Sequence, residues 1–141
     1  MTLTGVLRLV ADLAQATPHE PFRLVAEDDG WRMQAQVDGT WKSLYRFDLQ
    51  RQHPIDYEAP NHYLSTRPDS HFVTGLVAAR AAPDRRLALR NREFAVHPLR
   101  GATERRVLRS AAEIRQVLQD EFLIAVPDDA ALDRRLDALP G

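Results

Sequence analysis

Histidine and cysteine carry much of the nucleophilic, acid–base and metal chemistry of proteins, and this sequence has five histidines and no cysteine. Without a thiol, the chain has no cysteine nucleophile, no redox C-x-x-C motif and no cysteine-bound zinc or iron–sulfur cluster. No two histidines lie three or four residues apart on an expected helix, so we expect no metal site. The sequence also lacks the GxGxxG, P-loop, GxSxG and HExxH motifs. The histidines are His19, His53, His62, His71 and His97.

Positive charge is concentrated in the middle of the chain. The chain has 19 basic and 20 acidic side chains in total, but residues 80–115 hold 10 basic and only 4 acidic ones. One interpretation is a site for an anionic cofactor, because arginine forks match phosphate geometry. The alternative is a set of solvated outward strand faces, which also keep sheets from pairing with each other. No interleaving of aromatic and basic residues accompanies the charge, so we expect no nucleic-acid partner.

The hydropathy of the chain predicts a protein without a membrane span. The longest apolar stretches, such as residues 72–79, are far shorter than the ~20 residues that cross a bilayer. The first residues lack a basic leader followed by an apolar run and a small-residue cleavage site. We therefore expect a cytoplasmic protein with no membrane partner.

Any functional site must be held in place by secondary structure, and the first elements that the sequence predicts form an antiparallel β meander. Residues 31–37 alternate apolar and polar side chains, which is typical of a half-buried strand. Asp38 and Gly39 favour a type I′ turn, after which residues 41–49 form a second strand. Residues 21–25 are predicted to add a strand before this hairpin.

A second group of elements follows a proline-punctuated connector. Residues 50–68 are predicted to be this connector, with a short helix that starts at Asp56. Residues 72–80 suit a strand, and Pro83 favours a tight turn before another strand at residues 87–90. Weaker strand patterns follow at residues 94–96 and 104–108.

The C-terminal part is predicted to be helical. Ser110 and Glu113 have the spacing of a capping box, so a helix should begin there. Its apolar stripe requires a partner, most simply the preceding sheet. A last helix is expected over residues 129–139. The sequence thus predicts an α+β fold, with an antiparallel meander or partial barrel followed by a small antiparallel sheet and a C-terminal packing helix. The apolar stripe of the helix that begins at Ser110 consists of Ile114, Val117, Leu118 and Phe122.

Three longer phrases occur in a fixed order, at residues 17–24 (TPHEPFRL), 41–49 (WKSLYRFDL) and 56–72 (DYEAPNHYLSTRPDSHF). Together they closely resemble the arylamine N-acetyltransferase (N-hydroxyarylamine O-acetyltransferase) family, and the resemblance extends over nearly the whole chain. It implies that residues 1–50 are the end of the family's second, β-barrel domain. Residues 51–68 would then be a connector with a short helix, and residues 69–141 an α/β lid domain.

The resemblance implies acetyl transfer from acetyl-CoA to arylamines or N-hydroxyarylamines through an acetylated cysteine, which belongs to a Cys-His-Asp triad. The family's Arg-Gly-Gly-x-Cys and Asp-Val-Gly-Phe-Gly phrases have no counterpart here. The chain therefore resembles the C-terminal half of such an enzyme and is expected to be inactive alone. A different interpretation is a non-catalytic remnant or interaction module from a truncated or split gene.

The resemblance also assigns roles to four residues. Phe72 matches an aromatic residue of the acceptor pocket, whereas Tyr63, Thr66 and Ser70 lie in the phrase that the family places near coenzyme A. Arg67 stands where the family commonly has histidine. The alternative for Tyr63 and Phe72 is simple core packing. Expected partners are an N-terminal half that carries the triad, or a second copy bound through exposed apolar surface.

Overall fold

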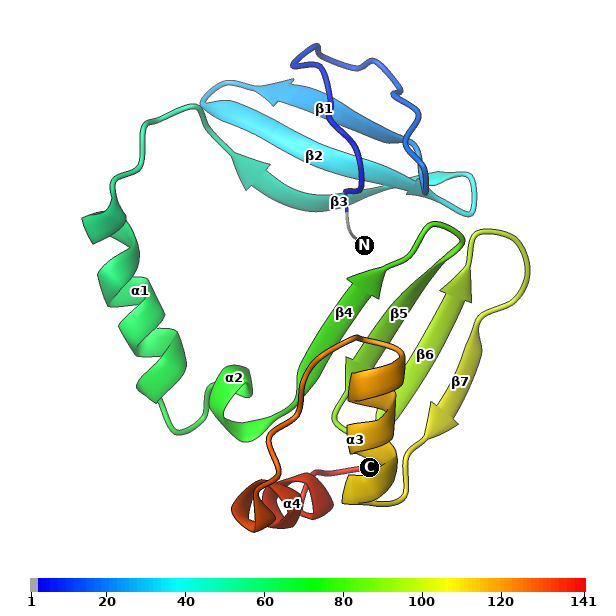
Figure 1. Cartoon of the computed structure of the whole chain (residues 1–141). Helices are drawn as coiled ribbons and strands as arrows, with labels where there is room; N and C mark the ends of the chain where they lie inside the picture. The colour runs from blue at the N-terminus through cyan, green and yellow to red at the C-terminus, as the bar shows by residue number, and fades with distance from the viewer. Residues whose placement is uncertain (1–2) are drawn as a thin grey trace. The chain divides into compact units, whose positions relative to one another are not determined.

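The computed structural model describes residues 3–141, and the chain divides into two compact units at the boundary between His53 and Pro54 (Figure 1). The first unit is a β meander, and the second combines a sheet with four helices. Across residues 3–141, no helix is both long enough and apolar enough to cross a lipid bilayer.

The first unit is a three-stranded antiparallel sheet with the order β1-β2-β3. Its strands are β1 (Phe22–Glu27), β2 (Gly30–Val37) and β3 (Thr40–Phe47). The turn between β2 and β3 has positive φ angles at Asp38 (51°) and Gly39 (75°), as the predicted type I′ turn requires. The predicted meander is therefore confirmed, and it is an open sheet rather than a closed barrel. Its buried core consists of Phe22, Leu24, Met33 and Ala35.

The second unit contains a four-stranded antiparallel sheet with the order β4-β5-β6-β7. Apolar residues face each other across neighbouring strands, as in the pairing of Leu87 with Val96 and of Leu89 with Phe94. Pro83 lies in the turn between the first two strands, as predicted. The strands are β4 (Val77–Ala81), β5 (Arg85–Arg90), β6 (Glu93–Pro98) and β7 (Glu104–Val107).

Helix α3 (Ala111–Asp120) lies over one side of this sheet, and α4 (Ala130–Asp137) packs against α3 below the end of the sheet (Figure 1). The apolar stripe of α3 packs against β5 and β6, and Phe94 meets Phe122 edge to face with 5.9 Å between ring centroids. This confirms the predicted α+β fold with a C-terminal packing helix. The buried cluster comprises Leu87, Leu89, Phe94, Leu108, Ala111, Ile114, Val117, Leu118, Phe122 and Leu136.

Side-chain caps set where these two helices begin. Ser110 Oγ accepts a hydrogen bond from Glu113 N at 3.2 Å, as the capping box predicts. The Glu113 carboxylate accepts from Arg109 N at 2.8 Å, one residue earlier than the Ser110 amide that the motif predicts. At α4, Asp129 accepts from Ala131 N at 2.7 Å.

Arg92, in the turn between β5 and β6, anchors the end of α4. Its guanidinium donates hydrogen bonds to the carbonyl oxygens of Leu108 (3.2 Å), Asp137 (2.6 Å) and Leu139 (2.8 Å). The last carbonyls of a helix have no partner within the helix, so an arginine here satisfies them and complements the negative end of the helix dipole.

The segment before the second sheet differs from the prediction. The expected short helix is α1 (Pro54–Thr66), which continues through Pro60, and residues 72–74 belong to a second helix, α2 (His71–Thr74), rather than to a strand. The helical turn forms because Ser70 caps it: Ser70 Oγ accepts from Phe72 N at 3.3 Å. The strand begins only after Gly75, at Val77.

Candidate functional site

Three of the four predicted site residues line one shallow cavity of about 220 Å³ between the end of α1 and the start of α2. Tyr63 comes from the last turns of α1, Ser70 caps α2, and Phe72 lies in the first turn of α2. The fourth predicted residue, Thr66, does not line this cavity. Leu64, Arg67, Asp69 and His71 complete the lining, and the prediction had given none of them a role.

Arg67 connects two of these side chains. Its guanidinium lies over the Tyr63 ring, 5.1 Å from the centroid, and pairs with both oxygens of the Asp69 carboxylate. The Nη2 to Oδ2 distance is 2.8 Å. This hydrogen bond from Arg67 is the main cause of a lowered pKa of the Asp69 carboxyl. Arg67 therefore links the Tyr63 ring to the Asp69 carboxylate.

Ser70 and Thr66 already use their hydroxyl protons within the fold. Ser70 Oγ donates to the Leu64 carbonyl at 2.6 Å, and Thr66 Oγ1 donates to the His62 carbonyl at 2.7 Å. A hydroxyl group has one proton to donate and two lone pairs. Each of these side chains is therefore placed to accept a hydrogen bond from a ligand rather than to donate one.

The aromatic residues of the cavity are not core residues. Phe72 is 71% exposed and Tyr63 is 52% exposed, whereas the core residues Phe94 and Phe22 are almost fully buried. The core-packing alternative therefore does not describe Tyr63 and Phe72 in this chain. Their rings are open to an aromatic or adenine-like ligand, which would gain from stacking.

Two further cavities border α2. One, of about 450 Å³, shares Phe72 and is mainly apolar, with Leu132, Leu136 and Leu139 in its wall and Arg135 as its charged group. The other, of about 580 Å³, includes His71 and Arg90. Arg90 thus brings one positive charge of the basic 80–115 segment to a cavity that borders α2. Among residues 3–141, no cluster of three histidine, cysteine or acidic side chains could hold a metal ion.

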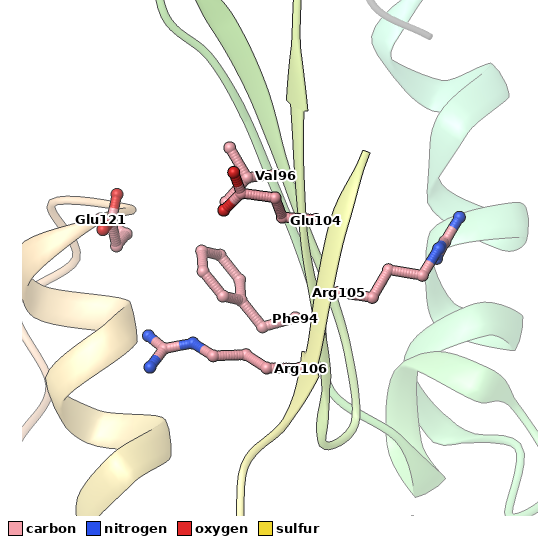
Figure 2. Close-up of a pocket in the computed structure, with 6 residues that line it drawn as sticks. All are labelled: Phe94, Val96, Glu104, Arg105, Arg106 and Glu121. Atoms are coloured by element: carbon pink, nitrogen blue, oxygen red, sulfur yellow. The ribbon is translucent and has the colours of Figure 1, made fainter. Parts of the chain in front are cut away.

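A cavity of about 370 Å³, which the sequence analysis missed, lies between β6, β7 and the C-terminal end of α3 (Figure 2). Phe94 and Val96 form its apolar floor, and the Arg106 guanidinium lies 5.2 Å from the centre of the Phe94 ring. Glu104 and Glu121 add carboxylates from two distant segments, while Arg105 points to the opposite face of the sheet (Figure 2). Side chains alternate between the two faces of a strand, and this alternation could have predicted part of the cavity from the sequence. It places Phe94 and Val96 of β6 on the same face as Glu104 and Arg106 of β7.

Several arginines of the basic segment serve the fold rather than a ligand. Arg80 donates to the Glu121 carbonyl at 2.7 Å, Arg115 donates to the Pro127 carbonyl at 2.7 Å, and Arg92 anchors α4 as described above. Arg85 also lies 3.6 Å from the Glu121 carboxylate. For these residues the positive charge compensates backbone carbonyls and carboxylates within the second unit.

Comparison with known proteins assigns the sequence to a family. The model of the N-acetyltransferase family matches residues 1–131. An arylamine N-acetyltransferase of Mycolicibacterium smegmatis is 43% identical over 132 residues, which are 94% of this chain and 48% of the relative. The corresponding protein of Escherichia coli is 40% identical over 128 residues, 90% of this chain and 46% of the relative.

Solved structures agree with this assignment. The arylamine N-acetyltransferase of Mycobacterium tuberculosis superposes with a TM-score of 0.87 at 42% identity, over 93% of this chain and 49% of that protein. The Mycobacterium marinum enzyme, solved in complex with CoA, gives a TM-score of 0.89 at 40% identity over 97% of this chain and 51% of that protein. The chain thus spans about half the length of the relatives that it matches. It belongs to the N-acetyltransferase family and corresponds to the C-terminal half of the arylamine N-acetyltransferases.

Proposed function

We propose that this chain supplies the acceptor side and the CoA side of a cytoplasmic acetyltransferase that moves acetyl from acetyl-CoA to an arylamine or N-hydroxyarylamine. The main support is the cavity at the junction of α1 and α2, where Tyr63, Ser70 and Phe72 come together. A relative of the same fold, from M. marinum, has been solved with CoA. The division into a barrel end (residues 1–50), a connector (51–68) and a lid (69–141) is part of the same proposal.

In this scheme the exposed Phe72 ring packs against the aromatic ring of the acceptor. Tyr63, Thr66 and Ser70 lie on the CoA side, where the Thr66 and Ser70 hydroxyls accept hydrogen bonds because their protons are already donated to backbone carbonyls. The 141 residues contain no cysteine, so the thiolate that attacks the acetyl-CoA thioester must come from the half of the enzyme that this chain does not match. The chain alone is therefore inactive.

The test is a chimera in which this chain replaces the matching half of the M. smegmatis enzyme. Purified chimera and purified 141-residue chain are compared for acetyl-CoA-dependent acetylation of an anisidine. The expected result is turnover by the chimera and no turnover above buffer by the chain. A variant of the chimera whose catalytic cysteine is replaced by alanine controls for a contaminating acetyltransferase.

Two results would count against the proposal. Turnover by the chain alone would show that it carries its own nucleophile. A chimera that has the circular dichroism and melting behaviour of a folded protein, yet transfers no acetyl group, would instead favour a non-catalytic remnant or interaction module.

A further inference from the structure

The junction between α2 and β4 is held by a side chain of the β5–β6 turn, that of Asn91 (Figure 1). Asn91 Oδ1 accepts a hydrogen bond from Leu76 N at 3.0 Å, and Asn91 N donates to the Leu76 carbonyl at 2.7 Å. The pairing of β4 with β5 begins at Val77 and Arg90, so Asn91 adds one further pair to it, with a side-chain oxygen as one acceptor. The hydrogen-bonded ladder therefore extends to Leu76, two residues after α2 ends.

The backbone of the turn explains why asparagine suits this position. The φ angle of Asn91 is 52°, in the left-handed region that asparagine and glycine tolerate best. Of these two residues, only asparagine has a side-chain oxygen that can accept a hydrogen bond. A methyl group added at Gly75 would lie 3.0 Å from Asn91 Oδ1 and 3.2 Å from the His71 carbonyl oxygen. The contact therefore depends on a short acceptor at position 91 and on the absence of a side chain at position 75.

Helix α2 depends on contacts at its two ends. None of its four residues, His71–Thr74, is buried. At its start, the Ser70 hydroxyl donates to the Leu64 carbonyl at 2.6 Å. After its end, the Leu76 side chain packs against the core of the second unit, and Asn91 holds the Leu76 backbone. A helix of one turn without buried side chains has little stability of its own, so these two anchors set where α2 lies.

The position of α2 also sets the position of the Phe72 ring. Phe72 is 71% exposed and borders both the cavity of about 220 Å³ and the apolar cavity of about 450 Å³. We propose that Asn91 is a positioning residue for the acceptor: it holds the end of α2, so that Phe72 forms a fixed wall that selects acceptors by size. This inference rests on the proposed function. Asn91 lines neither of these two cavities, so it acts through α2 and not by contact with the acceptor.

The first test measures backbone order parameters by NMR relaxation on the 141-residue chain. Amides of residues 73–76 should have values of about 0.85, as in rigid backbone. Asn91→Gly suits the positive φ angle but removes the acceptor, so the values should fall below about 0.6. Asn91→Asp keeps an oxygen acceptor and should restore them. Asp38→Gly, at a residue with a φ of 51° in the β2–β3 turn, is the matched control and should change nothing in this segment. Unchanged order in Asn91→Gly would overturn the inference.

The second test is kinetic and uses the chimera of this chain with the M. smegmatis enzyme. Asn91→Gly should lower kcat/KM for an anisidine about fivefold and leave the KM for acetyl-CoA unchanged. The ratio of kcat/KM between the anisidine and a two-ring arylamine should also shift about fivefold, because a loosened ring no longer selects by size. Asn91→Asp should recover both values.

The outcomes separate positioning from a general structural role. Equal losses for both acceptors together with a raised KM for acetyl-CoA, or no recovery by Asn91→Asp, would overturn the inference. An unaltered chimera that transfers no acetyl group would refute the proposed function and with it the acceptor role. The order parameters of the 141-residue chain would still show whether Asn91 holds α2.

Discussion

At the scale of single residues, the candidate site depends on how Arg67 is placed. This side chain stacks on Tyr63 and pairs with Asp69, so it fixes one wall of the cavity. The pair of Arg67 and Asp69 is exposed, so it contributes little to the free energy of unfolding. It still orients the two side chains, because the guanidinium binds both carboxylate oxygens.

The Arg67 and Asp69 pair gives a pH-dependent prediction. The pair favours the ionised carboxylate, so the pKa of Asp69 in the folded chain lies below its usual value. The ion pair therefore makes a small contribution to the free energy of unfolding at pH values above about 3.9, the pKa of an aspartate in the unfolded chain. This contribution disappears as the pH falls through the lower pKa that Asp69 has in the folded chain. Arg67→Gln should raise the pKa of Asp69 toward the unfolded value, as measured by NMR titration of the carboxyl carbon. Arg100→Gln is the control, and an equal shift in both variants would contradict the assignment.

Phe72 allows a kinetic prediction in the active chimera. Phe72→Ala removes an exposed ring that, in the proposed function, packs against the acceptor, so kcat/KM for an anisidine should fall about tenfold while KM for acetyl-CoA changes little. Val77→Ala, at a similarly exposed residue of the same unit, is the matched control. A fall in melting temperature that accounts for the lost activity, or equal loss in the control, would show that Phe72 has no role at the acceptor.

At the scale of elements, Arg92 links the β5–β6 turn to the end of α4. Arg92→Met keeps much of the side-chain length but leaves the carbonyls of Leu108, Asp137 and Leu139 without their charged donor. The free energy of unfolding should fall by about 1–3 kcal/mol, as expected for hydrogen bonds to a charged group. Urea denaturation measures this change, with Arg134→Met in α4 as the control. An unchanged midpoint would mean that solvent replaces the arginine at no cost.

The elements also show which parts of the fold a sequence can specify. The type I′ turn at Asp38 and Gly39 and the caps at Ser110 and Asp129 were predictable, because they depend on neighbours within four residues. Residues 72–74 were wrongly predicted as strand, since their apolar composition suits a strand while the cap at Ser70 makes them helical.

The candidate site was predictable only in part, for a similar reason. Tyr63, Ser70 and Phe72 are close in the sequence, and one short turn is enough to bring them together. The cavity of Figure 2 was missed because it joins β7 to the end of α3, and no local pattern links Glu104 to Glu121. For Phe72 the resemblance implied a place in the acceptor pocket, but the residue pattern by itself left core packing as an equal alternative.

At the scale of the whole molecule, the two units have cores of different size. The first unit buries the four residues of its small cluster, whereas the cluster of the second unit has ten. Small sheets with few buried residues are marginal in water. Amides of β2 should therefore exchange at least about tenfold faster than those of β5 in the 141-residue chain, as measured by hydrogen exchange. Equal protection would show that the units unfold as one.

The central claim is that this chain is one part of an acetyltransferase whose nucleophile lies on the other part. The most direct measurement is the initial rate of anisidine acetylation as the unmatched half of the M. smegmatis enzyme is added to a fixed amount of the 141-residue chain. We predict no turnover by either polypeptide alone, and a rate that rises and saturates as the complex forms. Turnover by the chain alone, or no turnover once the two polypeptides are shown to be bound, would contradict the claim.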